Sequence, residues 1–193
     1  MNALNALKAD TFRQYGRSSW LLTMKGALRY RTFRVVVTMR LCQAAAASHG
    51  PARLALPLFR MLHRSAANRA GVDFSWQTKV GAGLALTHGW GLVVSPDARI
   101  GSNVTLFHGV TIGQRDHISP EGTRLTEYPV LEDEVWVGPH AIVVGGVTIG
   151  RGSRIGGGAF VAESVPPYSV VVGNPAEVVS NKCVPDVINP VPL

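Results

Sequence analysis

The spacing of hydrophobic residues changes near residue 70. Before this point, apolar side chains recur at helical spacing over residues 20–30, and residues 35–47 and 54–63 are dense in good helix formers. The breaker pair Gly50–Pro51 separates the last two segments. The pattern therefore predicts an α-helical region over residues 1–70, built from about three helices.

A six-residue repeat replaces the helical pattern in the second part of the chain. Each repeat is led by an aliphatic residue: Val94, Ile100, Leu106, Ile112, Leu131, Val137, Val143, Ile149, Ile155 and Val161. The fourth position after most lead residues is small or β-branched, as at Val135, Ala141, Val147, Ser153, Ala159 and Val165. A glycine often follows the lead residue directly, as at Gly101 and Gly138.

Such a repeat is typical of a parallel β-helix. Each unit forms a short strand and a turn, and three units make one triangular coil of about 18 residues. Stacked coils bury the lead residues in a narrow prism, the small residue fits the interior, and glycine serves the corner. We expect this mainly β domain at residues 71–179. A β-sandwich with chance periodicity is the alternative, and the unbroken run from Leu131 to Val161 disfavours it.

Two interruptions of the repeat mark the places where we expect chemistry. A step of eight residues separates Leu86 from Val94. A longer excursion, residues 114–129, is rich in glycine, proline and charge. Insertions in a repeat architecture map to loops on the binding face. After the last repeat, we expect residues 180–193 to cap or wrap the final coil.

Positive charge is concentrated in the helical region. The chain carries a net charge of +7, but residues 1–70 hold twelve Lys/Arg against Asp10 alone, whereas residues 71–193 are net acidic. Basic helices with apolar faces are compatible with peripheral contact with an anionic membrane surface, although a helical cap used for packing or oligomerisation is the preferred interpretation. No nucleic-acid-binding module accompanies the charge.

Other features of the sequence narrow the class of protein. Cys42 and Cys183 match no zinc or redox spacing, so we expect neither a structural metal nor a disulfide scaffold. No signal peptide and no apolar run of membrane-spanning length is visible. These features predict a cytoplasmic protein, with the inner face of the membrane as the site of any peripheral contact.

Several segments carry a family resemblance. They read LTHGWGLVVSPDARIG, NVTLFHGVTIG, PVLEDEVWVGPHAIVVGGVTIGRGSRIGGGAFV and SVPPYSVVVGNPAEVV. Over residues 73–179 the chain resembles serine acetyltransferases and their polysaccharide-modifying relatives of the colanic-acid type. The resemblance implies a left-handed coil and a homotrimer. It also implies that acetyl-CoA and the acceptor bind between adjacent prisms, and that a histidine base promotes direct transfer without a metal.

A base for this reaction must take the proton of a hydroxyl group, and a histidine with a pKa near 7 suits that task. His88 lies in the step of eight, and Asp73 lies fifteen residues earlier, close to one coil away. Both match the aspartate–histidine pair of serine acetyltransferases, so we expect them to form the catalytic dyad. His108 is the second candidate, as a base or as a residue that orients the acceptor.

Two further histidines have weaker claims. His117 lies in the excursion, where galactoside-type acetyltransferases place their base, although a solvated loop histidine is the preferred interpretation. His140 is either structural or part of the coenzyme cleft.

The resemblance also indicates a coenzyme site. It places the donor for the oxyanion at the backbone near Gly113 and Gln114. Small residues would let the pantetheine arm lie against backbone, and the candidates are Pro139, Gly157, Gly158, Ala159 and Pro175. Arg151, Arg154 and Lys182 are candidates for the coenzyme phosphates, whereas Glu177 stands where relatives often carry a basic residue.

The acceptor is inferred from positions at which this chain departs from the serine acetyltransferase pattern. Where serine acetyltransferases carry an arginine–histidine–proline run, this chain has Glu127, Tyr128 and Pro129, and Thr87 replaces the aspartate before the base. The loss of these charged groups predicts that serine is rejected. A saccharide hydroxyl of a capsule or exopolysaccharide precursor becomes the expected acceptor, with Trp90 stacking on the sugar or serving in packing. A serine acetyltransferase of cysteine synthesis and a non-catalytic trimeric scaffold remain the alternatives.

Overall fold

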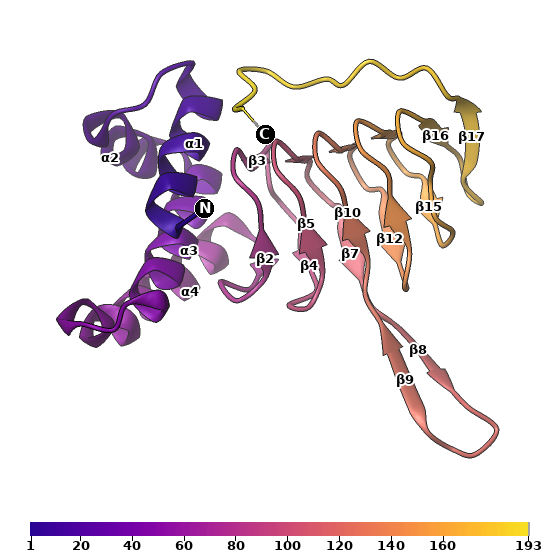
Figure 1. Ribbon diagram of the computed structural model, residues 1–193, viewed down its shortest axis with the longest axis horizontal. Helices are drawn as coiled ribbons and strands as arrows, with labels where there is room; N and C mark the ends of the chain where they lie inside the picture. Colours follow the sequence, from indigo (N-terminus) through magenta and orange to yellow (C-terminus); the bar gives the residue numbers. More distant parts are fainter. Residues whose placement is uncertain (193) are drawn as a thin grey trace.

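The structure is a computed structural model that describes residues 1–192, and it joins a helical block end-on to a triangular prism of short strands (Figure 1). The helices are α1 (Ala3–Tyr15), α2 (Trp20–Arg29), α3 (Arg31–Ala47), the 3-10 helix η1 (Pro51–Ala55) and α4 (Leu56–Ala70). The hydrophobic pattern missed α1. That helix buries only a narrow face around Ala6 and Leu7, and its ends are set by the Asn2 cap and by Gly16 in the left-handed conformation.

The first four coils of the prism each contribute one strand to each of three parallel faces, and the last coil adds strands to two of them. Face A holds β1 (Asp73–Phe74), β4 (Val93–Val94), β7 (Thr111–Gly113), β12 (Ile142–Val144) and β15 (Phe160–Val161). Face B holds β2 (Lys79–Val80), β5 (Arg99–Ile100), β10 (Val130–Leu131) and β13 (Thr148–Ile149). Face C holds β3 (Ala85–Leu86), β6 (Thr105–Leu106), β11 (Trp136–Val137), β14 (Arg154–Ile155), β16 (Val170–Val172) and, antiparallel at its end, β17 (Glu177–Ser180). This is the predicted left-handed parallel β-helix with an N-terminal helical region.

The lead aliphatic residues stack inside the prism in three columns. The column of face A joins Phe74, Val94, Ile112, Val143 and Val161. Face B stacks Val80, Ile100, Leu131 and Ile149, and face C stacks Leu86, Leu106, Val137, Ile155 and Val171. Nearly all of them belong to one buried core. The six-residue repeat is therefore confirmed as the spacing between successive faces.

The glycines that follow the lead residues serve close approach between coils. A Cβ on Gly101 would lie 2.6 Å from the Asp133 carboxylate, and one on Gly138 would lie 2.8 Å from the Gly157 nitrogen. Neither glycine has a positive φ; the left-handed corner positions are held by other residues, such as Asn103. Glycine is needed here because adjacent coils leave no room for a side chain.

The helical block closes the open end of the prism. Val35, Val36 and Met39 of α3 are buried in the same core as the first coils. Between the block and the prism lies a buried ion pair, in which the Arg40 Nε donates to Asp10 at 2.8 Å. Asp10 also accepts from the backbone nitrogen of Leu84 at 2.9 Å. The pair thus holds α1, α3 and the first coil together.

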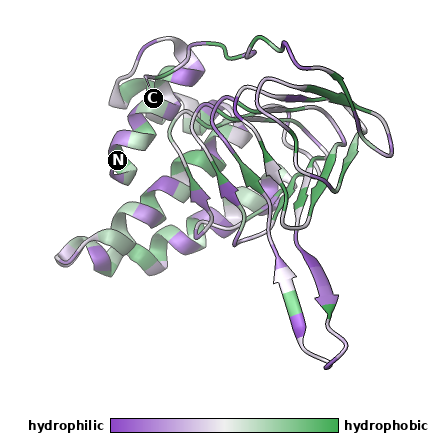
Figure 2. Cartoon of the chain, turned by 45° about the vertical axis from the view of Figure 1, so that its right-hand side comes forward, coloured by the Kyte–Doolittle hydropathy of each residue, from purple (hydrophilic) through white to green (hydrophobic). Residues whose placement is uncertain are grey.

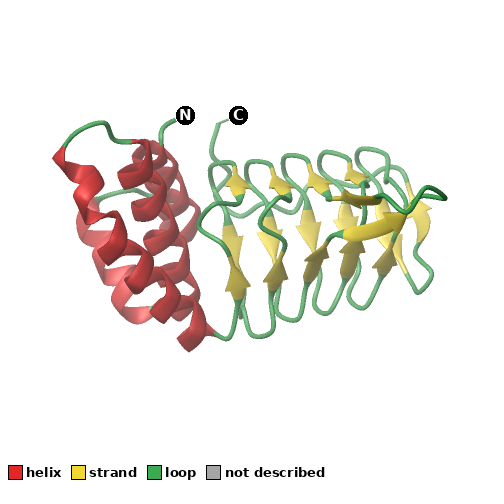
Figure 3. Cartoon of the chain, turned by 90° about the horizontal axis from the view of Figure 1, so that it is seen from below, coloured by secondary structure: helices red, strands yellow, loops and turns green. Residues whose placement is uncertain are grey.

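The two remaining segments leave the prism. Residues 114–129 form a hairpin of β8 (Arg115–Ile118) and β9 (Arg124–Glu127), which projects away from the coils and carries mostly hydrophilic residues (Figure 2). The chain after β17 runs back along the prism to the helical end (Figure 1), so the C-terminus lies beside the helices (Figure 3). There Asn103 bonds to both backbone groups of Val191. The tail thus extends beyond the last coil, where it was expected, and runs the length of the prism.

His63 ties α4 to the first coil and gives the fold a pH dependence. It is buried, its Nε2 lies 2.8 Å from the Phe74 carbonyl oxygen, and burial lowers its pKa. The unfolded chain therefore takes up this proton first, so the stabilisation is present above about pH 6.5 and lost as pH falls, by up to about 1.4 kcal/mol per unit. Thermal unfolding between pH 8 and 5.5 should show a smaller fall in Tm for His63→Gln than for the wild type. Parallel curves would contradict this.

Candidate active site

Three histidines line one edge of the prism, the CA edge, where the chain turns from face C to face A. His88 follows β3, His108 follows β6 and His140 follows β11, so they occupy the same corner in successive coils. The ring centroids of His88 and His108 are 5.8 Å apart, and those of His108 and His140 are 5.0 Å apart. One corner of the β-helix thus carries a ladder of imidazoles that can take and give protons.

His88 is displayed by a strained loop that the helical block holds. Its φ is +64°, a left-handed conformation that is uncommon outside glycine. The Arg31 guanidinium at the start of α3 donates to the His88 carbonyl oxygen and, at 3.2 Å, to that of Ala70. The same guanidinium lies 3.8 Å from the ring of Trp90. Arg31 therefore ties the His88 loop to the end of α4 and covers one face of Trp90.

His108 and His140 pack closely against each other and against Gly109. A Cβ at Gly109 would overlap the His140 ring, and the φ of Gly109 is +67°, so only glycine fits there. The Nδ1 of His108 is buried and has no hydrogen-bond partner in residues 1–192. The His140 ring thus lies against Gly109 at this corner, although the residue is exposed.

Asp73 lies on face A at the start of β1, and its side chain is exposed. Among the described residues, no hydrogen bond or ion pair joins its carboxylate to His88. The catalytic dyad of Asp73 and His88 stays a prediction.

The small residues expected to contact the coenzyme follow the ladder along the same edge. Pro139 and the exposed Gly157 and Gly158 occupy the corresponding corner in the later coils. A Cβ on Gly158 would meet nothing within 4 Å, so this corner is open to solvent. Ala159, in contrast, is fully buried at the small interior position and offers no surface to a ligand. Pro175 is exposed beyond β16.

The other predicted site residues lie at a different edge, the AB edge, between faces A and B. Gly113 ends β7 and Gln114 begins the excursion, so both lie at the root of the hairpin. On the hairpin itself, Glu127 lies 3.2 Å from the Nε2 of His117 and 3.7 Å from a guanidinium nitrogen of Arg115. The chain thus divides its candidate residues between two edges.

Comparisons with known proteins indicate the family to which the chain belongs. Residues 128–163 match the model described as bacterial transferase hexapeptide (six repeats). The serine acetyltransferase of Bacillus licheniformis is 38% identical over 109 residues, or 56% of this chain and 48% of that protein. That of Mycobacterium tuberculosis is 39% identical over 124 residues, or 62% and 52%. The soybean serine acetyltransferase apoenzyme superposes with a TM-score of 0.68 at 30% identity, covering 92% of this chain and 69% of that one. The chain belongs to the hexapeptide-repeat acetyltransferases.

The family members it matches correct the expected acceptor. This hexapeptide-repeat acetyltransferase spans about half the length of the curated relatives named above, and those relatives carry the name serine acetyltransferase. The prediction of a saccharide acceptor, and of closest kinship with the polysaccharide-modifying branch, is therefore wrong. The inference from Glu127 overlooked the Arg115 guanidinium, which lies 3.7 Å from that carboxylate within the hairpin.

Two of the predicted phosphate-binding residues are already engaged. Arg151 pairs with Glu134 at 2.9 Å, and Arg154 pairs with Asp186 while lying over the Trp136 ring. The Arg154 pair joins the C-terminal tail to face C. Both arginines therefore serve the fold, whatever else they contact.

Reasoning from the sequence missed Arg31 and the cations of face B, Lys79 and Arg99. Each of these two cations precedes an inward-facing lead residue, and they lie twenty positions apart. That spacing, read in the register of the coils, could have placed them side by side. For Arg31 no sequence signal existed, because its contacts join a helix to a loop far along the chain.

Proposed function

We propose that this chain transfers the acetyl group of acetyl-CoA to the hydroxyl of serine, with His88 as the general base. The observation that carries the proposal is the 34–39% identity to several serine acetyltransferases over 109 to 124 residues. The imidazole ladder supports it, because acyl transfer to an alcohol needs a base near neutral pH.

The chemistry follows from what each group can do. His88 takes the proton of the serine hydroxyl as the oxygen attacks the thioester carbonyl. The resulting oxyanion accepts hydrogen bonds from backbone N–H groups near Gly113 and Gln114. When the tetrahedral intermediate collapses, the C–S bond breaks and the sulfur takes the proton from the imidazolium. The products are O-acetylserine and free coenzyme A.

The proposed active unit is a homotrimer. His88 lies on the CA edge and Gly113 on the AB edge, so the two edges of face A carry complementary parts of the site. If face A turns toward a threefold axis, the CA edge of one copy meets the AB edge of the next. A cyclic arrangement repeats that contact identically at each interface.

The proposed activity is tested by following thiol release from acetyl-CoA with a panel of L-serine, other amino acids, simple sugars and oligosaccharides. Release with L-serine, with O-acetylserine identified by mass spectrometry, is the expected result. Release with sugars and none with serine would overturn the proposal.

Peripheral membrane contact through residues 1–70 stays a prediction. No helix in residues 1–192 is long and apolar enough to cross a membrane. On α2, Trp20 and Leu21 are 52% and 71% exposed beside the basic Lys25 and Arg29. Sedimentation with anionic vesicles, but not with neutral ones, is the result that would support contact at this face.

Arg31 is expected to position the proposed base. Arg31→Ala frees the His88 loop, so kcat should fall about 10- to 100-fold while the KM for serine changes little. Added guanidinium ion should restore part of the loss. Arg34→Ala is the matched control, because Arg34 also bonds two carbonyls, of Ala27 and Leu28, but none near His88. Equal losses in both variants, without rescue, would show a merely structural role.

A further inference from the structure

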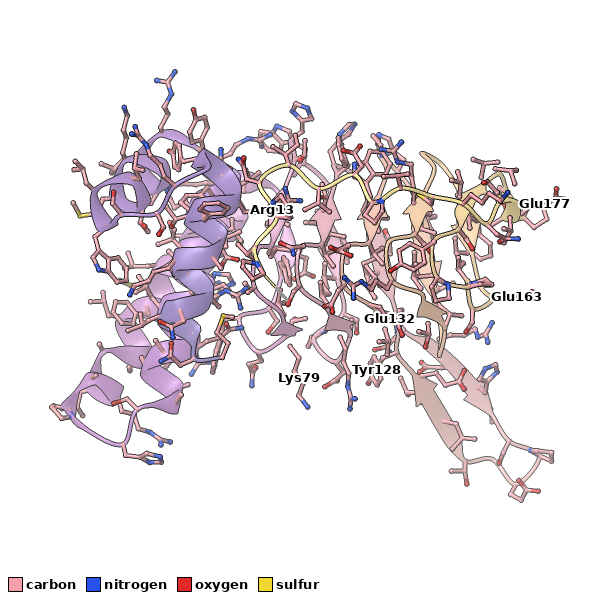
Figure 4. All side chains as sticks on the ribbon, turned by 45° about the horizontal axis from the view of Figure 1, so that its top comes forward. Arg13, Lys79, Tyr128, Glu132, Glu163 and Glu177 are labelled. Atoms are coloured by element: carbon pink, nitrogen blue, oxygen red, sulfur yellow. The ribbon has the colours of Figure 1, made fainter. Side chains whose placement is uncertain are left out.

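A cavity of about 380 Å³ opens on face B beside the root of the hairpin. Lys79 of β2, Arg99 of β5 and Tyr128 line it together with Asp97. Lys79 and Tyr128 project from the same side of the prism (Figure 4). The cavity lies at the AB edge, next to Gly113 and Gln114, and none of the candidate catalytic side chains lines it.

The two cations in this cavity are direct neighbours on face B. Lys79 and Arg99 are register partners in adjacent parallel strands, which lie about 4.8 Å apart, and both side chains are exposed. Within residues 1–192 neither forms an ion pair with an acidic side chain. Like charges placed directly opposite each other are destabilising. A bound anion between them would relieve that repulsion.

The other polar groups of the cavity indicate that the anionic group belongs to a larger ligand, which also carries a positive charge. The Tyr128 hydroxyl lies beside the Asp97 carboxylate, and desolvation and, after it, that carboxylate raise the pKa of Tyr128. Asp97 adds one negative charge to a cavity that holds two positive ones. An α-amino acid carries the matching set, because its carboxylate suits the cations and its ammonium group suits the aspartate.

We propose that the cavity of Lys79, Arg99, Asp97 and Tyr128 binds the charged end of the amino-acid acceptor, with the carboxylate on the two cations. This assignment rests on the proposed function and gives it a specificity site. In the proposed trimer the cavity lies at the AB edge that meets the His88 edge of the next copy. The serine hydroxyl would then point across the interface to the base.

The test compares L-serine with L-serinamide, which lacks the carboxylate, in the full-length protein. Lys79→Met and Arg99→Gln are each expected to raise the KM for serine about tenfold, as the loss of one charge-assisted hydrogen bond does, and to leave serinamide turnover unchanged. The double variant should treat the two substrates alike. Arg69→Gln, which removes an exposed charge at the end of α4, controls for net charge and should match the wild type.

The outcomes separate this inference from the proposed function. If the KM for acetyl-CoA rises instead, the cations bind a coenzyme phosphate and the inference fails. It also fails if serine and serinamide lose activity in parallel. If the wild type does not acetylate serine at all, the proposed function fails. Calorimetry of L-serine binding then tests the inference. If the wild type binds L-serine and the double variant does not, the inference is supported. If the wild type does not bind L-serine, the inference is overturned.

Discussion

Replacing His88 with alanine is expected to lower kcat for acetyl transfer to serine by about 10²- to 10⁴-fold, because an alcohol without a general base is a poor nucleophile at neutral pH. The KM for acetyl-CoA should stay within a few-fold of the wild type, since the predicted coenzyme surface lies in the later coils. Steady-state thiol release measures both parameters.

The neighbouring imidazole provides the control for this prediction. His108→Ala removes the ring 5.8 Å away, next in the ladder, and should cost less than His88→Ala if His88 alone takes the proton. Should His108→Ala abolish turnover while His88→Ala keeps it, the base is His108. A His88→Ala protein with unchanged activity toward every acceptor would instead leave the base unassigned, and an inactive wild type would favour the trimeric scaffold.

Replacing Asp10 with alanine is expected to destabilise the fold by about 3–5 kcal/mol, because it leaves the buried Arg40 without its partner. Arg40 has a side-chain exposure of only 2%, so water cannot replace the lost carboxylate. The same substitution removes the acceptor for the Leu84 nitrogen, which weakens the joint between helices and prism. Urea unfolding at a fixed protein concentration gives the difference.

The double variant Asp10→Leu/Arg40→Met distinguishes charge from packing. It removes both members of the pair, so it should recover much of the stability that Asp10→Ala loses. If the double variant unfolds as easily as the single one, the cost lies in the hydrogen bonds to the first coil and not in the unpaired charge.

The β-helix could be predicted from the sequence because the same local packing requirement recurs every six residues. Positions such as Leu131 and Val137 must be aliphatic wherever a coil turns inward, so six-residue spacing alone locates all three faces. The same register placed His88 at an interruption of the repeat. These predictions needed no knowledge of distant contacts.

What the sequence did not reveal depends on contacts between segments far apart. Helix α1 is held by Asp10 against residues of the first coil, and the tail is held by Asn103 at Val191. Neither contact leaves a periodic signal. The acceptor prediction failed for the same reason, since the partner that neutralises Glu127 lies across a hairpin whose pairing the spacing did not specify.

The central claim is that two edges of neighbouring copies build one site, and mixed oligomers test it most directly. His88→Ala copies keep an intact face B cavity, and Lys79→Met/Arg99→Gln copies keep an intact His88. Co-expressed at equal levels, the two should restore about a quarter of wild-type activity at serine concentrations far below KM, because each mixed trimer holds one interface with both intact edges. Activity no higher than that of the separate variants would contradict the account.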